Sequence, residues 1–309
     1  MAQLEHKVSA VIVTYNCENV IKSCIDSCLD EPIEIVVVDN ASSDATLSML
    51  EEYGSQIRLI ANPTNTGFTH ACNQAIETAA GEHIFLLNPD ARLVPGVTSM
   101  LLAELERDGR LGAVAPSLIF EDGSPQYYHR RFPTVLPLFV ESFVPQQHWL
   151  KFSSYRRFIY RDGGLEAGTT VEQPAGAALL LRGRPTLDEQ FFIYGSDLDL
   201  CRQIYEQGRY IKLVPAASVI HLQSKGGTEN PALSGALAVE SYAAYRRYFR
   251  KHNDVLQLVS FLSLFSCALF LRASLELLRN PRGFADRYAR LTCFLRGAGF
   301  QTYLEERSQ

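Results

Sequence analysis

The sequence predicts an α/β protein with a mostly parallel central sheet. Short apolar runs rich in β-branched residues recur through the first third of the chain, and segments with helical spacing separate them. Each run stops at polar or turn-forming residues, as buried strands do. Strands that alternate with helices favour a parallel sheet, because parallel neighbours need a crossover connection.

The individual elements follow from this pattern. The expected strands are 8–13, 33–38, 57–60 and 83–87. The expected helices are 17–29, 45–53 (after a cap at 42–44), 68–79 and 97–107. Further along we expect an apolar strand at 171–181 broken by Gly176, a helix at 197–207 that ends at Gly208, and short strands at 210–214 and 218–222.

The rest of the chain divides differently. The stretch 120–168 holds several prolines and aromatic residues without regular spacing, so we expect an irregular insertion or lid. We therefore predict a main domain at 1–238 and a helical region at 239–309. From residue 241 onward there are 11 Lys/Arg against 5 Asp/Glu, whereas residues 1–240 carry 18 against 29. A basic, apolar tail on an acidic body suggests a separate role for the tail.

Residues 255–271 contain no charged side chain. This length lies at the lower limit of the roughly 17–25 residues that cross a bilayer. Arginines follow at 272, 279, 282, 287, 290 and 296. The pattern suits a helix that lies on an anionic membrane surface, and it equally suits a buried bundle helix or a homodimer contact.

Composition excludes some classes. A net charge of −5 argues against a nucleic-acid partner, which usually binds a basic domain. The seven cysteines are odd in number and include no CxxC pair, so reduced thiols in a cytoplasmic protein are expected, and a zinc site is not. The N-terminus is polar, and no signal peptide is expected there.

Several nucleotide-binding and hydrolase motifs are absent. The first expected strand continues into Thr14-Tyr15-Asn16 where a dinucleotide site would have GxGxxG. There is also no GxxxxGK[ST] and no GxSxG. Common dinucleotide, P-loop and α/β-hydrolase sites are therefore not predicted.

Carboxylates at the ends of separate elements carry the chemistry. Asp39 and Asp90 follow strands, and Asp197 begins a helix. Ligands of open α/β sheets bind outside the carboxyl ends of the strands, so these side chains should gather at one edge. Oxygen ligands suit Mg²⁺ or Mn²⁺, which can neutralise a diphosphate leaving group, and a further carboxylate can act as general base toward a hydroxyl.

Five segments in order resemble the family 2 glycosyltransferases of the GT-A fold, in particular the rhamnosyltransferase-like branch of bacterial surface polysaccharide synthesis. They are VSAVIVTYN, VVVDNASSD, NPTNTGFTHACNQAI, FLLNPDARL and DEQFFIYGSDLDLCRQI, within residues 8–225. The resemblance implies an inverting transfer from a nucleoside-diphosphate sugar (dTDP-, UDP- or GDP-linked) to a saccharide or lipid-linked hydroxyl. It also implies Mg²⁺ or Mn²⁺, and a place at the cytoplasmic face of the inner membrane.

The resemblance assigns the donor side first. Thr14, Tyr15 and Asn16 would line the nucleoside pocket, and Asp39 would hold the base or ribose with Asn40 beside it. The family's N-x-G-F element matches Asn65, Gly67 and Phe68.

The resemblance also assigns the metal and the acceptor side. Asn88-Pro89-Asp90 stands at the metal-binding motif, with Asp90 as ligand, Asn88 beside the donor, and His221 near the metal or diphosphate. Asp197 matches the catalytic base. Asp188, Glu189 and Tyr194 belong to the acceptor side.

Two departures and several structural explanations keep alternatives open. Asn88 replaces the first aspartate of the metal motif, and Ser196 replaces the glutamate that usually precedes the base. Asp39 and Asp197 could serve only as caps, and His221 could be structural. The alternative function is a catalytically weak nucleotide-sugar-binding component of a polysaccharide assembly complex. A nucleotidyltransferase is less favoured, because no glycine-rich basic loop follows the first strand.

Overall fold

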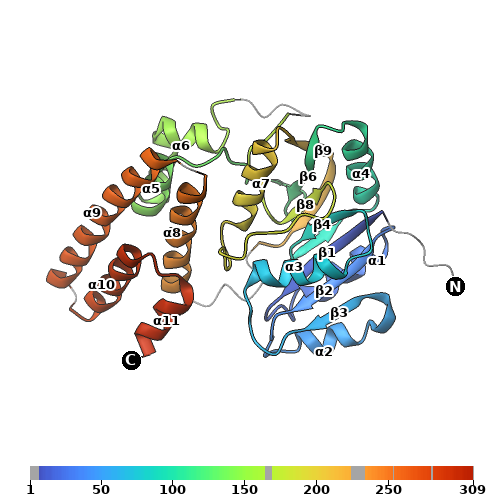
Figure 1. The fold of residues 1–309 in the computed structure, drawn as a ribbon, viewed down its shortest axis with the longest axis horizontal. Helices are drawn as coiled ribbons and strands as arrows, with labels where there is room; N and C mark the ends of the chain where they lie inside the picture. Colours follow the sequence, from blue (N-terminus) through green and yellow to red (C-terminus); the bar gives the residue numbers. More distant parts are fainter. Residues whose placement is uncertain (1–6, 164–168, 224–233, 253, 280, 309) are drawn as a thin grey trace. The chain divides into compact units, whose positions relative to one another are not determined.

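The computed structural model describes residues 7–163, 169–223, 234–252, 254–279 and 281–308, without the side chains of 234, 279, 281–284 and 305–308. Contacts within the chain divide it into two compact units (Figure 1). The first comprises residues 1–132, 163–192 and 196–229, and the second comprises 133–162, 193–195 and 230–309. The division near residue 230 lies close to the predicted domain boundary, but 133–162 groups with the C-terminal helices.

The first unit is built on one mixed sheet. Its strands lie in the order β3 (Arg58–Ala61), β2 (Glu34–Asp39), β1 (Val8–Thr14), β4 (His83–Leu87), β8 (Ala178–Leu181), β6 (Leu111–Ile119), β9 (Tyr210–His221) and β5 (Ala91–Leu93), with β7 (Pro125–Gln126) beside β6. Strands β3, β2, β1 and β4 are parallel. Strand β8 runs antiparallel to both β4 and β6, and β5 runs antiparallel to β9.

Helices cover both faces of this sheet because its central strands are apolar on both sides. Along β1, Ala10 and Ile12 join a core with α1 (Ile21–Leu29), α2 (Thr46–Glu51) and α4 (Val97–Arg107). The alternate residues Val11 and Val13 join a second core with α3 (Phe68–Thr78) and α7 (Ser196–Glu206). Successive strand side chains point to opposite faces, so one strand contributes to both layers.

The predicted fold class is confirmed, with corrections to single elements. The first four strands and helices α1, α3, α4 and α7 lie where the sequence pattern placed them, within a few residues. Antiparallel β8 interrupts the parallel arrangement after β4, and β6 and β9 then pair in parallel. Strands β5 and β6 were not predicted from the sequence. The expected strands 210–214 and 218–222 form one strand, β9, and the strand expected at 171–181 is regular only from Ala178.

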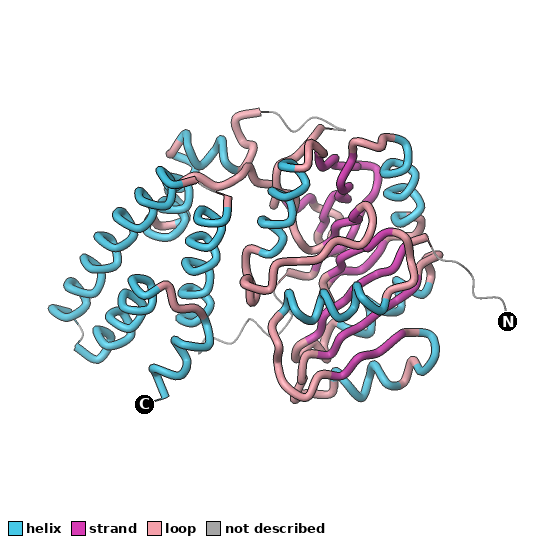
Figure 2. The backbone as a smooth tube through the Cα atoms, in the orientation of Figure 1, coloured by secondary structure: helices cyan, strands magenta, loops and turns pink. Residues whose placement is uncertain are grey.

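The described residues of the second unit form helices joined by loops and include no strand (Figure 2). It contains α5 (Val135–Phe143), the 3₁₀ turn η2 (Gln146–Lys151), α6 (Ser153–Phe158), α8 (Ser234–Lys251), α9 (Val255–Arg279), α10 (Pro281–Arg296) and α11 (Phe300–Ser308). Aromatic rings from α5, α8, α9 and α10 contact one another in its core: Phe139, Phe143, Tyr242, Phe261, Phe265 and Phe294.

The expectation of an irregular insertion at 120–168 is therefore wrong for a large part of that stretch. Prolines suggested broken structure, but Pro137 lies in the first turn of α5, where its missing N–H group leaves no helical bond unmade. Helix α5 instead packs against α9 and α6. One helix in the described residues, α9 at Val255–Leu278, is long and apolar enough to cross a membrane on length and composition.

Candidate active site

The carboxyl ends of β1 and β2 are joined through a buried aspartate. The Thr14 hydroxyl donates to Oδ1 of Asp39 at 2.9 Å, and the Ser42 hydroxyl donates to the same oxygen at 2.5 Å. The Ser42 N–H donates to Oδ2 at 3.0 Å. Asp39 is 1% exposed, and among the described residues its second oxygen accepts a single bond, from the Ser42 N–H. The arrangement orients the carboxylate and leaves Oδ2 able to accept one further hydrogen bond.

Asn40 organises the loop after β3. Its amide donates to Oδ1 of Asn65 at 2.9 Å and to the Gly67 carbonyl at 3.2 Å. Its oxygen accepts bonds from the Thr66 N–H and hydroxyl, both at 3.0 Å, and from the Asn62 amide at 3.2 Å. The side chain is therefore saturated by the protein. The donor-side assignment of Asn40 and Asn65 stays a prediction, and their hydrogen bonds hold this loop in shape.

The loop after β1 is joined to the loop after β2. Asn16 has φ of +53°, a left-handed conformation that asparagine tolerates better than most residues. Its Oδ1 accepts the Ser43 N–H at 2.8 Å, and its own N–H donates to the Ser42 hydroxyl at 2.9 Å. Tyr15, between Thr14 and Asn16, is 39% exposed. Of the three predicted pocket residues, Tyr15 has the most exposed side chain, and its ring could stack on a nucleoside.

The N-x-G-F element packs against the segment that precedes α7. The Phe68 N–H donates to the Phe192 carbonyl at 2.8 Å. Gly67 has φ of +88°, and a Cβ there would lie within 3 Å of the Phe192 ring and carbonyl. Glycine is therefore required twice, by the backbone conformation and by the close approach. Two segments that lie more than a hundred residues apart in the chain form one structure.

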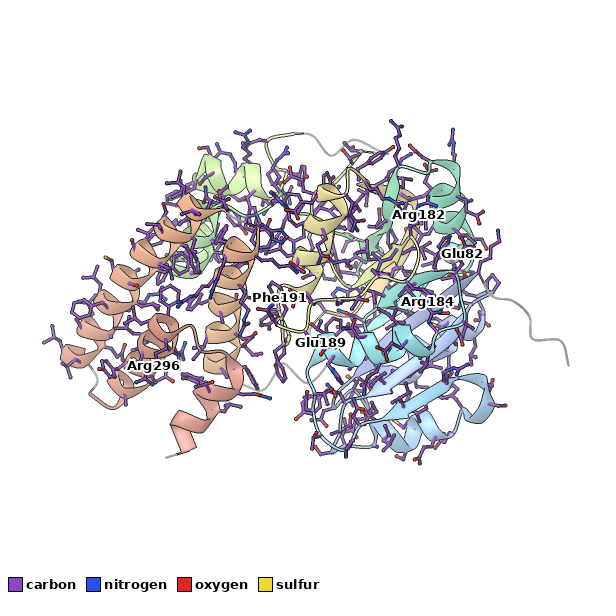
Figure 3. All side chains as sticks on the ribbon, viewed as in Figure 1. Glu82, Arg182, Arg184, Glu189, Phe191 and Arg296 are labelled. Carbon is purple, nitrogen blue, oxygen red and sulfur yellow. The ribbon has the colours of Figure 1, made fainter. Side chains whose placement is uncertain are left out.

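The same junction engages Glu189 (Figure 3). The Asn73 amide donates to Oε1 of Glu189 at 2.9 Å, and Nδ1 of His70 lies 3.0 Å from Oε2. These bonds lower the pKa of the Glu189 carboxyl. Asp188 accepts the Gln190 N–H at 3.0 Å in a turn. Both predicted acceptor-side carboxylates thus have partners inside the protein, and Glu189 ties its loop to α3.

Tyr194 lies in the short segment 193–195 that groups with the second unit. Its side chain is 38% exposed, and burial of the phenol raises its pKa. The hydroxyl therefore stays protonated at neutral pH and can donate a hydrogen bond.

The predicted metal residues meet as a pair. Nε2 of His221, at the end of β9, lies 3.4 Å from Oδ1 of Asp90, and both side chains are largely buried. Gln126 of β7 donates its amide to the His221 carbonyl at 2.6 Å and places its Oε1 3.0 Å from Nδ1 of His221. Because Oε1 can only accept, Nδ1 carries the proton in the neutral ring. The Nε2 lone pair then faces the Asp90 carboxylate.

Two lone-pair donors that face each other need a cation or a proton between them. A histidine that binds metal usually donates its other ring N–H to an acceptor, and Gln126 supplies that acceptor. Within the described ranges, no set of three His, Cys, Asp or Glu side chains converges on a metal position. Asp90 and His221 therefore fit a divalent ion only as a partial ligand set that a substrate would complete.

Asn88 differs from Asn40. Its backbone N–H donates to the Ala177 carbonyl at 2.9 Å, and its carbonyl accepts the Ala91 N–H at 3.0 Å. Its half-buried side-chain amide has no hydrogen bond with any described residue. The amide is thus free to contact a ligand at the end of β4.

Asp197 lies in the first turn of α7, next to Gly176, which precedes β8. A Cβ on Gly176 would lie 2.9 Å from Oδ2 of Asp197, so a larger residue there would displace this carboxylate. The Gln173 amide lies 3.5 Å from the same oxygen and donates to it. Removal of the carboxyl from water raises its pKa, which the Leu198 N–H and Gln173 partly oppose. A raised pKa suits a general base, because it increases the affinity of the ionised group for a proton.

The predicted residues thus gather in connected groups. Thr14 contacts Asp39, Asn40 contacts Asn65 and Gly67, and Asp90 contacts His221. The Asn88 N–H donates to the carbonyl of Ala177, and the preceding residue, Gly176, lies next to the Asp197 side chain. Sequence reasoning missed Gln126 and Gln173. Neither lies in a motif. The fold brings Gln126 of β7 to His221 at the end of β9, and it brings Gln173 to Asp197 in α7. Their roles become visible only from these tertiary contacts.

A sequence profile described as "Glycosyl transferase family 2" matches residues 9–169, just over half of the chain. The chain belongs to this family. An N-acetylglucosaminyl-diphospho-decaprenol L-rhamnosyltransferase of Mycobacterium tuberculosis is 26% identical to this glycosyltransferase over 227 residues, which cover 66% of the chain and 71% of the relative. The chain is therefore a transferase, and the predicted family is confirmed.

Solved structures agree on the fold. A mannosyltransferase from Pyrobaculum calidifontis, in complex with GDP-Man and Mn²⁺, aligns with a TM-score of 0.53 at 16% identity and covers 93% of the chain and 85% of its own length. A fragment of TarS from S. aureus aligns with a TM-score of 0.50 at 15% identity, over 97% and 92%. The glycosyltransferase has the GT-A fold with a C-terminal helical region.

Proposed function

We propose that this glycosyltransferase moves a sugar, with inversion, from a nucleoside-diphosphate donor to a hydroxyl of a saccharide or lipid-linked acceptor. The observation that carries the proposal is the pairing of Asp90 with His221 where β9 ends, and of Asp197 with Gln173 in the first turn of α7. The first pair suits a diphosphate leaving group and the second an attacking hydroxyl. Rhamnose is the proposed sugar, on the similarity to the mycobacterial rhamnosyltransferase.

The donor is bound by the loops after β1, β2 and β4. Oδ2 of Asp39 accepts an N–H of the base or a ribose hydroxyl, and the Tyr15 ring covers the nucleoside. The Asn88 amide donates to the phosphates or the sugar. Asn40, Asn65 and Gly67 contribute by holding the loop rigid, which reduces the entropy lost on binding.

Asp90 and His221 would hold a Mg²⁺ or Mn²⁺ ion together with the donor's diphosphate. When bound, the ion neutralises the negative charge that develops on the departing nucleoside diphosphate. Gln126 keeps the His221 proton on Nδ1 and thereby keeps Nε2 available as a ligand. The first unit has 14 Lys/Arg against 26 Asp/Glu, a net charge of −12, so a bound cation would add positive charge to an acidic unit.

Asp197 accepts the proton of the acceptor hydroxyl as the oxygen attacks the anomeric carbon. The carbon–oxygen bond to the nucleoside diphosphate breaks on the opposite face, so the configuration inverts. Gln173 and the Leu198 N–H orient the carboxylate, while burial preserves its affinity for the proton.

The direct test is sugar transfer to a soluble acceptor by wild type and Asp197→Asn, with donor binding measured in parallel. General base catalysis contributes roughly 10²–10⁴-fold, so the variant should lose about that factor in kcat and still bind donor. Full activity in Asp197→Asn would overturn the base assignment. Donor binding without transfer by the wild type to any acceptor would instead support a catalytically weak binding component.

A further inference from the structure

Helix α9 has an unusual distribution of side chains. One stripe, Phe261, Phe265, Leu269 and Ala273, recurs every four residues and is buried. This stripe packs on α5, α8 and α10. A helix of 25 residues with one buried face ordinarily carries charged and polar residues on the opposite face.

The opposite face of α9 is uncharged and mainly apolar, with Ser263 and Cys267 as its exposed polar or weakly polar residues. Leu256 is 75% exposed, Val259 55%, Phe270 61% and Leu278 83%. Between Val255 and Leu278 the helix has two charged residues, Arg272 and Glu276. Each follows a member of the buried stripe by three or seven residues, so both lie on the inner face. The Arg272 guanidinium lies 4.6 Å from the centre of the Phe143 ring.

The polarity of α9 is thus reversed relative to a helix in water. An uncharged apolar face about 37 Å long, from 25 residues at 1.5 Å each, faces outward while the charges face the protein. Exposed apolar patches of this size mark sites that a membrane or another protein covers.

Charge decides between these two occupants. The second unit has 15 Lys/Arg against 8 Asp/Glu, a net charge of +7. A second copy would bring a unit of the same charge against this face, whereas an anionic lipid surface would complement it. The inner face of α9 argues against a spanning helix, because crossing the bilayer would strip away the aromatic contacts of Phe261 and Phe265 with Tyr242, Phe249 and Phe294.

We propose that the outward face of α9 inserts shallowly into an anionic membrane, with the helix axis along the surface. The inference deepens the proposed function by naming the surface that would bring the enzyme to a lipid-linked acceptor. Membrane attachment does not depend on sugar transfer, so each can fail without the other.

The test is sedimentation of the full chain with vesicles of phosphatidylcholine alone or of phosphatidylcholine with an equal part of phosphatidylglycerol. The wild type should bind the anionic vesicles, release in high salt and be extracted by alkaline carbonate. Leu256→Ser with Phe270→Ser should weaken binding at least about tenfold, because two apolar side chains leave the lipid. The matched control is Leu29→Ser with Met100→Ser, two exposed apolar residues of the first unit.

Three results would overturn the proposal. They are absence of vesicle binding by the wild type, equal binding by the α9 variant, and resistance to alkaline extraction, which indicates a spanning helix. A wild-type dimer that the α9 variant converts to monomer, seen by light scattering and without vesicle binding, would show that a second copy covers the face. Transfer to a soluble acceptor should be unchanged in both double variants. If it is absent while vesicles bind as expected, the proposed function fails and the membrane surface stands.

Discussion

Replacement of Asn40 by alanine should destabilise the first unit because a buried side chain with five hydrogen bonds is lost. A typical hydrogen bond contributes about 1 kcal/mol net. Water can replace Asn40 at the partly buried side chains of Asn62, Asn65 and Thr66, but less readily at the Gly67 carbonyl. We therefore expect the free energy of unfolding to fall by about 3 kcal/mol, which corresponds to roughly 6–12 °C in Tm for a unit of this size.

The matched control is Asn88→Ala. This asparagine also follows a central strand, but its amide has no hydrogen bond with a described residue. Its removal should change the free energy of unfolding by less than about 0.5 kcal/mol. Thermal unfolding and donor-dependent stabilisation should be measured on both variants. A wild-type Tm in Asn40→Ala combined with lost donor binding would refute the positioning role and make Asn40 a direct contact.

Three further outcomes follow from the site. Gln173→Leu removes a hydrogen bond that lowers the pKa of Asp197, so the acidic limb of the kcat profile should move to higher pH, and an unmoved limb would contradict this link. Gln126→Leu frees Nδ1 of His221 and should raise the metal concentration for half-maximal activity about 10–100-fold, and an unchanged metal requirement would contradict this role. Gly67→Ala should lower Tm, since a positive φ costs an alanine about 1–2 kcal/mol. An unchanged Tm would show that the loop changes conformation to relieve the strain and the contact with Phe192.

Asp197→Asn should leave the free energy of unfolding at neutral pH unchanged or raise it. Burial raises the folded-state pKa of this carboxyl, so the folded protein holds the proton more tightly than the unfolded chain does. The contribution to stability is present below the unfolded pKa and is lost as pH rises through the folded pKa. At neutral pH the ionised group therefore destabilises the fold, and the neutral asparagine should give a Tm no lower than wild type. A large drop in Tm would show that loss of activity reflects loss of structure.

The sequence predicts the first half of the sheet well because β1, β2 and β4 are short, mainly apolar runs that polar residues follow. It fails at β6 and β9 because Pro116 and Pro215 interrupt the pattern. The structure accommodates both at a register irregularity between Pro116 and Ser117, where the ladder is already broken. Prolines in sheets are confined to such positions, and the register cannot be read before the pairing is known.

The site divides in the same way. Residues inside motifs, such as Asp39, Asp90 and Asp197, were predicted from type and position. Their supporting partners were not, because Gln126 and Gln173 act through tertiary neighbours that no local spacing reveals. The sequence also could not separate Asn40 from Asn88, since both are asparagines after buried strands and differ only in whether the amide already has partners.

The contact between the loop at 62–67 and the segment at 187–192 has a consequence for synthesis of the chain. Asn40 can shape the loop as soon as β2 and β3 pair, but the Phe192 carbonyl that receives the Phe68 N–H arrives about 120 residues later. At ribosomal rates of about 5–20 residues per second, several seconds pass between synthesis of the loop and synthesis of Phe192. During that time the Phe68 N–H has no bond to Phe192, and the Phe192 ring does not pack against Gly67. A nascent chain released before residue 192 would thus lack the contact that completes the loop at 62–67, and a separately supplied C-terminal fragment would have to provide it.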